Sequence, residues 1–151
     1  METIEERLYK YAEYKKQIEE LETQMREILD KKDALAERML KGQNLDTVRV
    51  MGGFSSDPVF AAVQKMVDEY GKQLDRIRRM LVDLYYMVND TDRMIREACL
   101  DEAEMRYVRT RYFQKYNLQQ TAARIGYSER QICRIRQKVL EKLEKCQCGV
   151  A

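Results

Sequence analysis

The residues best suited to chemistry are cations and amides gathered in one short stretch near the C-terminal end. The segment Glu129–Lys138, ERQICRIRQK, holds three arginines, one lysine and two glutamines. Arginine can donate two hydrogen bonds to guanine in the major groove of DNA, and glutamine can pair with adenine. Arginine and lysine can also neutralise a phosphate. These residue types favour recognition of a polyanion over catalysis.

The charge around this segment points the same way. The chain of 151 residues has a net charge of only +2, yet Arg106–Lys145 holds 11 basic and 3 acidic residues, a surplus of 8. Residues 1–100 hold 17 basic and 20 acidic residues, so they carry a net charge of −3. Such asymmetry favours a nucleic acid as the partner of the C-terminal third.

The segment must be positioned by an interrupted helix. In ARIGYSER, Gly126 can adopt the left-handed conformation that ends one helix, and Ser128 with Gln131 has the spacing of a capping box that starts the next. Tyr127 is apolar and can tuck into the bend, although the sequence does not show whether it is buried. A small residue at Ala122, where the helices would cross, completes the pattern of a helix-turn-helix.

The second helix of this pair then has an inward and an outward face. The inward face is predicted to hold Ile132, Ile135, Val139 and Leu143. We expect Arg136 and Lys138 to anchor phosphates, and the remaining outward residues to lie near base edges or the backbone. The candidate DNA-binding residues are Ser128, Glu129, Arg130, Gln131, Cys133, Arg134, Arg136, Gln137 and Lys138.

Two long amphipathic helices precede this region. The first is predicted over about residues 3–41, and the second from Pro58 to about Cys99. The second has apolar residues at alternating steps of four and three, which is a sustained heptad repeat. These residues are Val63, Val67, Tyr70, Leu74, Ile77, Leu81, Leu84 and Val88. So long a stripe must be covered. We favour self-association, with pairing inside one chain as the alternative.

Loops and shorter elements separate these helices. Residues 42–57 are rich in glycine and serine and are predicted to be a loop, after which Asp57 can cap a helix that begins at Pro58. The sequence leaves open whether the second helix kinks near Asn89. Asp101 and Glu104 have capping-box spacing for a third helix, which we expect to end around Asn117.

The sequence therefore predicts an all-α protein: two long, coiled-coil-like helices followed by a C-terminal helix-turn-helix domain. We expect three parts: a helical hairpin or coiled coil over residues 1–99, a DNA-binding domain over 100–145, and a tail over 146–151. No stretch approaches the roughly 20 apolar residues of a membrane span, and no signal peptide is evident, so we expect a cytoplasmic protein.

Catalytic and metal chemistry are not expected, and neither is a cofactor. The chain has no histidine to serve as the base of a nucleophilic triad. Tyrosine nucleophiles of recombinases act together with an Arg-His-Arg set of catalytic residues, which this sequence lacks. We therefore interpret Tyr85, Tyr86 and Tyr112 as packing residues. Cys146 and Cys148 form a lone C-x-C pair without a second pair nearby, which argues against structural zinc.

One segment also resembles region 4 of bacterial primary sigma factors, the C-terminal region that reads promoters. This segment is NLQQTAARIGYSERQICRIRQKVLEKL. The whole layout, including GGFSSDPVFAAV and GYSERQICRI, resembles the RinA/ArpU family of phage and prophage transcriptional activators over most of residues 45–145. The resemblance implies a regulator of phage late or packaging genes in a bacterial host. By position, the base-reading residues would be Glu129, Arg130, Cys133 and Arg134, with Gln131 nearer the backbone.

The chain departs from sigma factors in two ways. Cys133 stands where a basic residue often sits, and 151 residues leave no room for the other promoter-reading regions. Promoter melting is therefore not expected. Two alternatives to a sequence-specific regulator stay open: a module that binds RNA polymerase or another regulator, and a small terminase-like DNA-packaging protein, which would form a ring.

Overall fold

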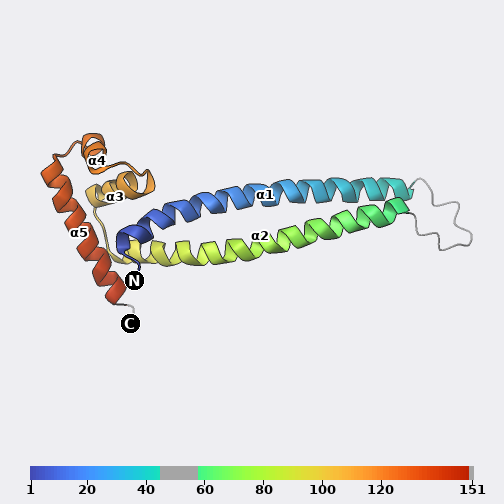
Figure 1. The fold of residues 1–151 in the computed structure, drawn as a ribbon, viewed down its shortest axis with the longest axis horizontal. Helices are drawn as coiled ribbons and strands as arrows, with labels where there is room; N and C mark the ends of the chain where they lie inside the picture. Colours follow the sequence, from blue (N-terminus) through green and yellow to red (C-terminus); the bar gives the residue numbers. More distant parts are fainter. Residues whose placement is uncertain (45–57, 150–151) are drawn as a thin grey trace, which may run out of the picture. The chain divides into compact units, whose positions relative to one another are not determined.

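The computed structural model describes residues 1–44 and 58–149, and every element within them is helical (Figure 1). This confirms the predicted all-α class, with two long helices followed by shorter ones. The elements are α1 (Ile4–Asn44), α2 (Pro58–Glu97), α3 (Glu102–Val108), a π-helical turn η1 (Arg109–Phe113), α4 (Leu118–Ile125) and α5 (Glu129–Cys148).

The chain forms two compact units. Unit 1 combines Met1–Ile18 with Asp83–Ala151, and unit 2 is Glu19–Val82. Unit 1 therefore contains the start of α1, the end of α2 and all the shorter helices, whereas unit 2 contains the rest of α1 and α2. The predicted division at residue 99 concerns which parts fold independently, and it stays a prediction.

The heptad stripe of α2 is buried within the chain. In unit 2, Leu74, Ile77 and Leu81 are between 2% and 7% exposed, and in unit 1 Val88 is 5% exposed. The opposing stripe of α1 is buried in unit 1 at Ile4, Leu8, Tyr11 and Ile18. Since α1 covers this stripe, the seam by itself does not require a second copy.

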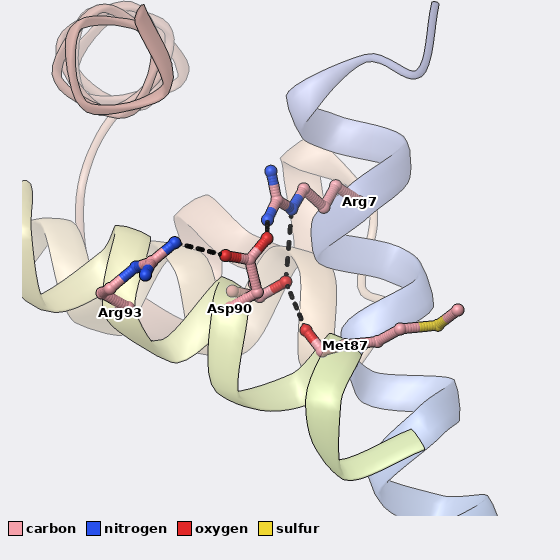
Figure 2. A network of polar contacts seen from close by, with 5 residues as sticks. Arg7, Met87, Asp90 and Arg93 are labelled. Atoms are coloured by element: carbon pink, nitrogen blue, oxygen red, sulfur yellow. Dashed lines mark hydrogen bonds and ion pairs between the residues drawn. The ribbon is translucent and has the colours of Figure 1, made fainter. Parts of the chain in front are cut away.

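Polar contacts fix α1 against α2 in unit 1 (Figure 2). Arg7 on α1 forms an ion pair with Asp90 and donates to the Thr91 hydroxyl at 3.3 Å. Arg93 also donates to Asp90, at 2.7 Å, while the Thr91 hydroxyl donates to the Met87 carbonyl one turn earlier. These directional contacts set the register of the two helices, because apolar seams alone allow them to slide.

The core of unit 1 is built on the shorter helices. Tyr107, Val108, Tyr112 and Ile132 are fully buried, as is Leu143. The start of α1 contributes to the same cluster, as do α2, α4 and α5; its other buried members are Ile4, Leu8, Met94, Ala98, Ala122 and Val139. The region predicted to bind DNA therefore shares one core with the N-terminal end of the chain.

The prediction that the third helix runs to about Asn117 is wrong. The α-helix ends at Val108, and η1 carries the chain to Phe113, where the Gln114 N–H donates to the Arg109 carbonyl at 2.9 Å. Lys115 then takes a left-handed backbone with a φ of 59°. Asn117 caps the following helix instead. A residue that caps a helix was mistaken for one that ends a helix, since asparagine serves both purposes.

Two smaller expectations also change. The predicted loop over 42–57 begins too early, because α1 continues through Gly42 to Asn44. The remainder of that loop, including Asp57 as a cap, lies outside the described residues. The second helix is not broken near Asn89, since α2 runs without interruption from Pro58 to Glu97.

Candidate nucleic-acid interface

The turn between α4 and α5 has the geometry that its sequence predicts. Gly126 is left-handed, with a φ of 82°, and its N–H donates to the Ala122 carbonyl at 2.9 Å. The Tyr127 N–H donates to the same carbonyl at 3.1 Å. Two backbone donors at the end of α4 are thus satisfied while the chain reverses, which is the role of a left-handed helix end.

The start of α5 is capped from both directions. The Ser128 side chain accepts from the Gln131 backbone N–H at 3.3 Å, and the Gln131 side chain accepts from the Ser128 N–H at 3.0 Å. A capping box of this kind contributes about 1 kcal/mol to helix stability. Ser128 and Gln131 are therefore occupied by the turn, although both stay exposed.

Three residues of α5 hold it against the core. Ile132, Val139 and Leu143 are fully buried, as predicted, and Ile135 is half-buried beside them. Ala122 on α4 is 5% exposed, so a small side chain does lie in the core between the two helices. The open question about Tyr127 is answered, since its side chain is 38% exposed.

The opposite edge of α5 faces solvent. The exposed candidates on this helix are Glu129, Arg130, Gln131, Cys133, Arg134, Gln137 and Lys138. Within the part of the chain that the structure describes, Arg130, Arg134 and Lys138 form no ion pair. These three cations keep all their donors available, so an external polyanion can bind them without breaking an internal pair.

Arg136 is the exception among the predicted phosphate anchors. Its Nε donates to the Glu5 carboxylate at 2.9 Å, and the Tyr112 hydroxyl donates to the same oxygen at 2.9 Å. The hydrogen bond from Arg136 holds the pKa of Glu5 below its usual range, against the opposing effect of burial. Arg136 therefore joins α5 directly to Glu5 of α1, and the buried Tyr112 donates to the same carboxylate. One guanidinium donor of Arg136 is thus already used within the fold.

Sequence reasoning missed both partners of this contact. Glu5 lies 131 residues before Arg136, and its helix was assigned to a separate part of the chain. Tyr112 was interpreted as a packing residue. Burial raises the pKa of Tyr112, and its hydroxyl lies 3.4 Å from that of Tyr107. No short-range pattern could have revealed a contact that depends on how the long helix returns to the C-terminal region.

A second ion pair ties α5 to the core from its other end. Lys142 donates to Glu104 at 2.7 Å, and the Glu104 side chain is only 4% exposed. The same carboxylate accepts from the Asp101 N–H and completes the predicted capping box of α3. Lys142 is thus held at the protein core and contributes less to the exposed cationic edge than its charge suggests.

A further cation outside the predicted set borders the turn. Arg124 on α4 is exposed and lies over the Tyr116 ring, 4.1 Å from the ring centroid. Arg111 donates to the Tyr116 carbonyl at 2.8 Å, which fixes that residue from the other side. Arg124 belongs to the basic surplus of Arg106–Lys145, but it was not predicted as a DNA-binding residue because it lies on α4 and not on α5.

Among the residues that the structure describes, neither a metal-binding cluster nor a membrane-spanning helix is found. Across the described ranges, no group of three or more His, Cys, Asp or Glu side chains is placed to hold a metal ion. Cys133 is a free, exposed thiol on α5, and the remaining cysteines are also unpaired. No helix in residues 1–44 or 58–149 is long and apolar enough to cross a membrane.

Comparison with known proteins identifies the C-terminal region. Residues 98–145 match the family model described as sigma-70, region 4, and this range contains α3, α4 and most of α5. No curated protein and no solved structure matches the chain. The match and the capped, left-handed turn between α4 and α5 agree: residues 98–145 form a sigma-70 region 4-like helix-turn-helix, the DNA-binding module of a regulatory protein.

Proposed function

We propose that this protein is a sequence-specific DNA-binding transcriptional regulator of the RinA/ArpU type, which activates late genes of a phage or prophage in the cytoplasm of its bacterial host. It acts by binding, without catalysis and without a cofactor. The resemblance of GGFSSDPVFAAV and GYSERQICRI to that family supports the role as a phage activator. The matched region 4-like segment supports DNA binding.

One observation carries the proposal: the solvent-facing edge of α5 holds Arg130 and Arg134 one helical turn apart, without an internal partner among the described residues. Residues four apart lie on one helix face, so both guanidinium groups point the same way. An α-helix fits the major groove, where arginine distinguishes guanine from other bases. The buried row of Ile132, Val139 and Leu143 fixes which edge faces outward.

Arg130→Ala and Arg134→Ala test base recognition. The preferred site is first selected from a random DNA pool with the full-length protein. Each variant should then lose about 1–3 kcal/mol of binding free energy on that site and much less on scrambled DNA, because a bidentate contact to a base is lost. Titration of labelled duplexes followed by fluorescence anisotropy measures both affinities.

Lys138→Ala is the matched control, since it removes one exposed cation from the same helix. It should weaken binding to every sequence alike and reduce the slope of log affinity against log salt by about 0.9. Equal losses on selected and scrambled DNA for Arg130→Ala and Arg134→Ala would remove base recognition from the proposal. Protection of a promoter only when RNA polymerase is present would favour the polymerase-binding alternative.

A further inference from the structure

Unit 2 has an apolar row beside its buried seam. With Val67, Leu74 and Leu81 at heptad position a, the preceding position g holds Met66, Gln73 and Met80. Met66 is 47% exposed and Met80 is 48% exposed. Their spacing of two heptads places both side chains on one line along α2, with Gln73 midway between them.

The facing helix has a matching row. On α1 the g positions of unit 2 are Leu21, Ile28 and Leu35, all half-buried. In an antiparallel pair the two g rows flank the same side of the seam. Unit 1 shows this placement directly, because its own g residues Arg7 and Tyr14 of α1 and Met87 of α2 line one hollow.

The other flank of unit 2 is different in character. Its e positions hold Glu19, Arg26 and Asp33 on α1, with Gln64, Gly71 and Arg78 on α2. A two-stranded pair needs apolar residues only at a and d. A third apolar position widens the stripe to the width found in larger helical bundles. Unit 2 thus has one side suited to further helix packing and one suited to water.

The α2 row is self-complementary about Gln73. When two copies of α2 run antiparallel with Gln73 at the centre, Met80 of each lies opposite Met66 of the other. Glu69 of each copy then lies next to Arg76 of the other, and neither has an ion-pair partner among the residues that the structure describes. Opposite charges near the centre of an antiparallel pair select that register.

The surface of α2 next to Met66 is hollowed. A shallow, mostly apolar groove of about 470 Å³ lies there. Its lining residues are Ala62, Lys65, Met66, Glu69, Tyr70 and Gln73. Residues 62, 65, 66 and 69 have the spacing of a hole that accepts one knob from a facing helix. In the register above, that knob is Met80 of the second copy.

We propose that two copies of this chain associate through the g face of unit 2, with the two α2 helices antiparallel about Gln73, to form a four-helix bundle. The inference concerns residues Glu19–Val82 alone and does not rest on DNA binding. Its failure would leave the role of α5 intact.

Light scattering of the purified full-length protein tests the association. At micromolar concentration the wild type should have twice the mass of the 18.1 kDa chain. Met66→Glu with Met80→Glu should return the mass to that of one chain, because both residues are exposed in the single chain and buried only in the pair. The helical circular dichroism spectrum should be unchanged, which separates lost association from lost folding.

The matched control places the same two charges on the far side of α2. Ala61→Glu with Val82→Glu also alters exposed residues, and Val82 is 64% exposed. This variant should keep the doubled mass. A monomeric wild type, a dimer that survives Met66→Glu with Met80→Glu, or a ring of many copies would each overturn the proposal.

Cross-linking tests the register. In a parent with its four cysteines changed to serine, Gln73→Cys should form a disulfide-linked dimer on mild oxidation, because a disulfide needs Cα atoms within about 7 Å. Lys72→Cys, one residue away on another face, should stay unlinked. Equal cross-linking at both positions, or none at Gln73→Cys in a protein that light scattering finds dimeric, would rule out this register.

Discussion

At the scale of single residues, Arg136 differs from the three other cations of α5 that are predicted to bind DNA. Its pair with Glu5 joins the first helix of unit 1 to the last, whereas Arg130, Arg134 and Lys138 face solvent. An arginine cannot give its full set of donors to a phosphate while one of them bonds a carboxylate. That Arg136 anchors a phosphate stays a prediction. In addition, Arg136 contributes an ion pair to the stability of the fold, which Arg130, Arg134 and Lys138 do not.

Glu5→Gln should reveal that contribution through its pH dependence. The pKa of Glu5 in the folded protein is lowered from 4.5. Its charge therefore stabilises the fold fully above pH 4.5, and the effect is lost as pH falls through the lowered value. We expect Glu5→Gln to cost about 1 kcal/mol or less at pH 7, since the pair is partly exposed, and to cost progressively less below pH 4.

Urea unfolding of wild type and variant at several pH values measures this difference. Glu13→Gln is the control, because Glu13 pairs with Lys115 at a site where both side chains are about half exposed. It should cost less than Glu5→Gln at pH 7. A constant deficit for Glu5→Gln from pH 7 to pH 3 would show that the carboxylate charge does not act as described.

At the scale of elements, the turn between α4 and α5 sets the direction of the cationic edge. It depends on Gly126, whose left-handed backbone is costly for any residue with a Cβ. A methyl group added there meets no atom within 4 Å. The cost of a substitution is therefore conformational and does not arise from crowding.

Gly126→Ala should destabilise unit 1 by about 1–2 kcal/mol, the cost of a left-handed backbone for alanine. Gly71→Ala offers the opposite case. Gly71 lies inside α2, where an added methyl also meets nothing, so alanine should stabilise that helix by up to about 1 kcal/mol. Thermal unfolding followed by circular dichroism measures both changes. Equal effects of the two substitutions would contradict a backbone role for Gly126.

The turn illustrates which features can be predicted from a sequence. Gly126, Ser128 and Gln131 act within a few residues, so their pattern specifies the bend and the start of α5 without knowledge of the rest. The heptad of α2 is similarly local: of its eight predicted residues, four are half-buried and four are buried, namely Leu74, Ile77, Leu81 and Val88. Local patterns failed where one residue type has two uses, as when Asn117 capped α4 instead of ending the helix before it.

At the scale of the whole molecule, the contacts that escaped prediction are those between distant segments. The helix-turn-helix shares its core with the first residues of the chain. The Tyr9 and Tyr112 rings lie 5.1 Å apart, and those of Tyr11 and Phe113 lie 4.9 Å apart. The sequence of residues 1–18 does not predict these partners, because its aromatic residues also fit the periodicity of a coiled coil. The core around the helix-turn-helix is thus completed by residues from the start of the sequence.

We propose that the exposed edge of α5 lies in the major groove of a preferred DNA site. Cys133 lies on that edge and is a free, exposed thiol. A protein that retains Cys133 alone, with the remaining three cysteines changed to serine, can be mixed with the selected duplex carrying a thiol tether in its major groove.

We expect a disulfide cross-link at one or two bases of the site, and we expect it to be lost when the site is scrambled. A protein that retains only Cys99, which lies before α3, should cross-link poorly to the same duplex. Binding to the site without a Cys133 cross-link, or equal cross-linking from Cys99 and Cys133, would contradict the placement of α5 in the major groove.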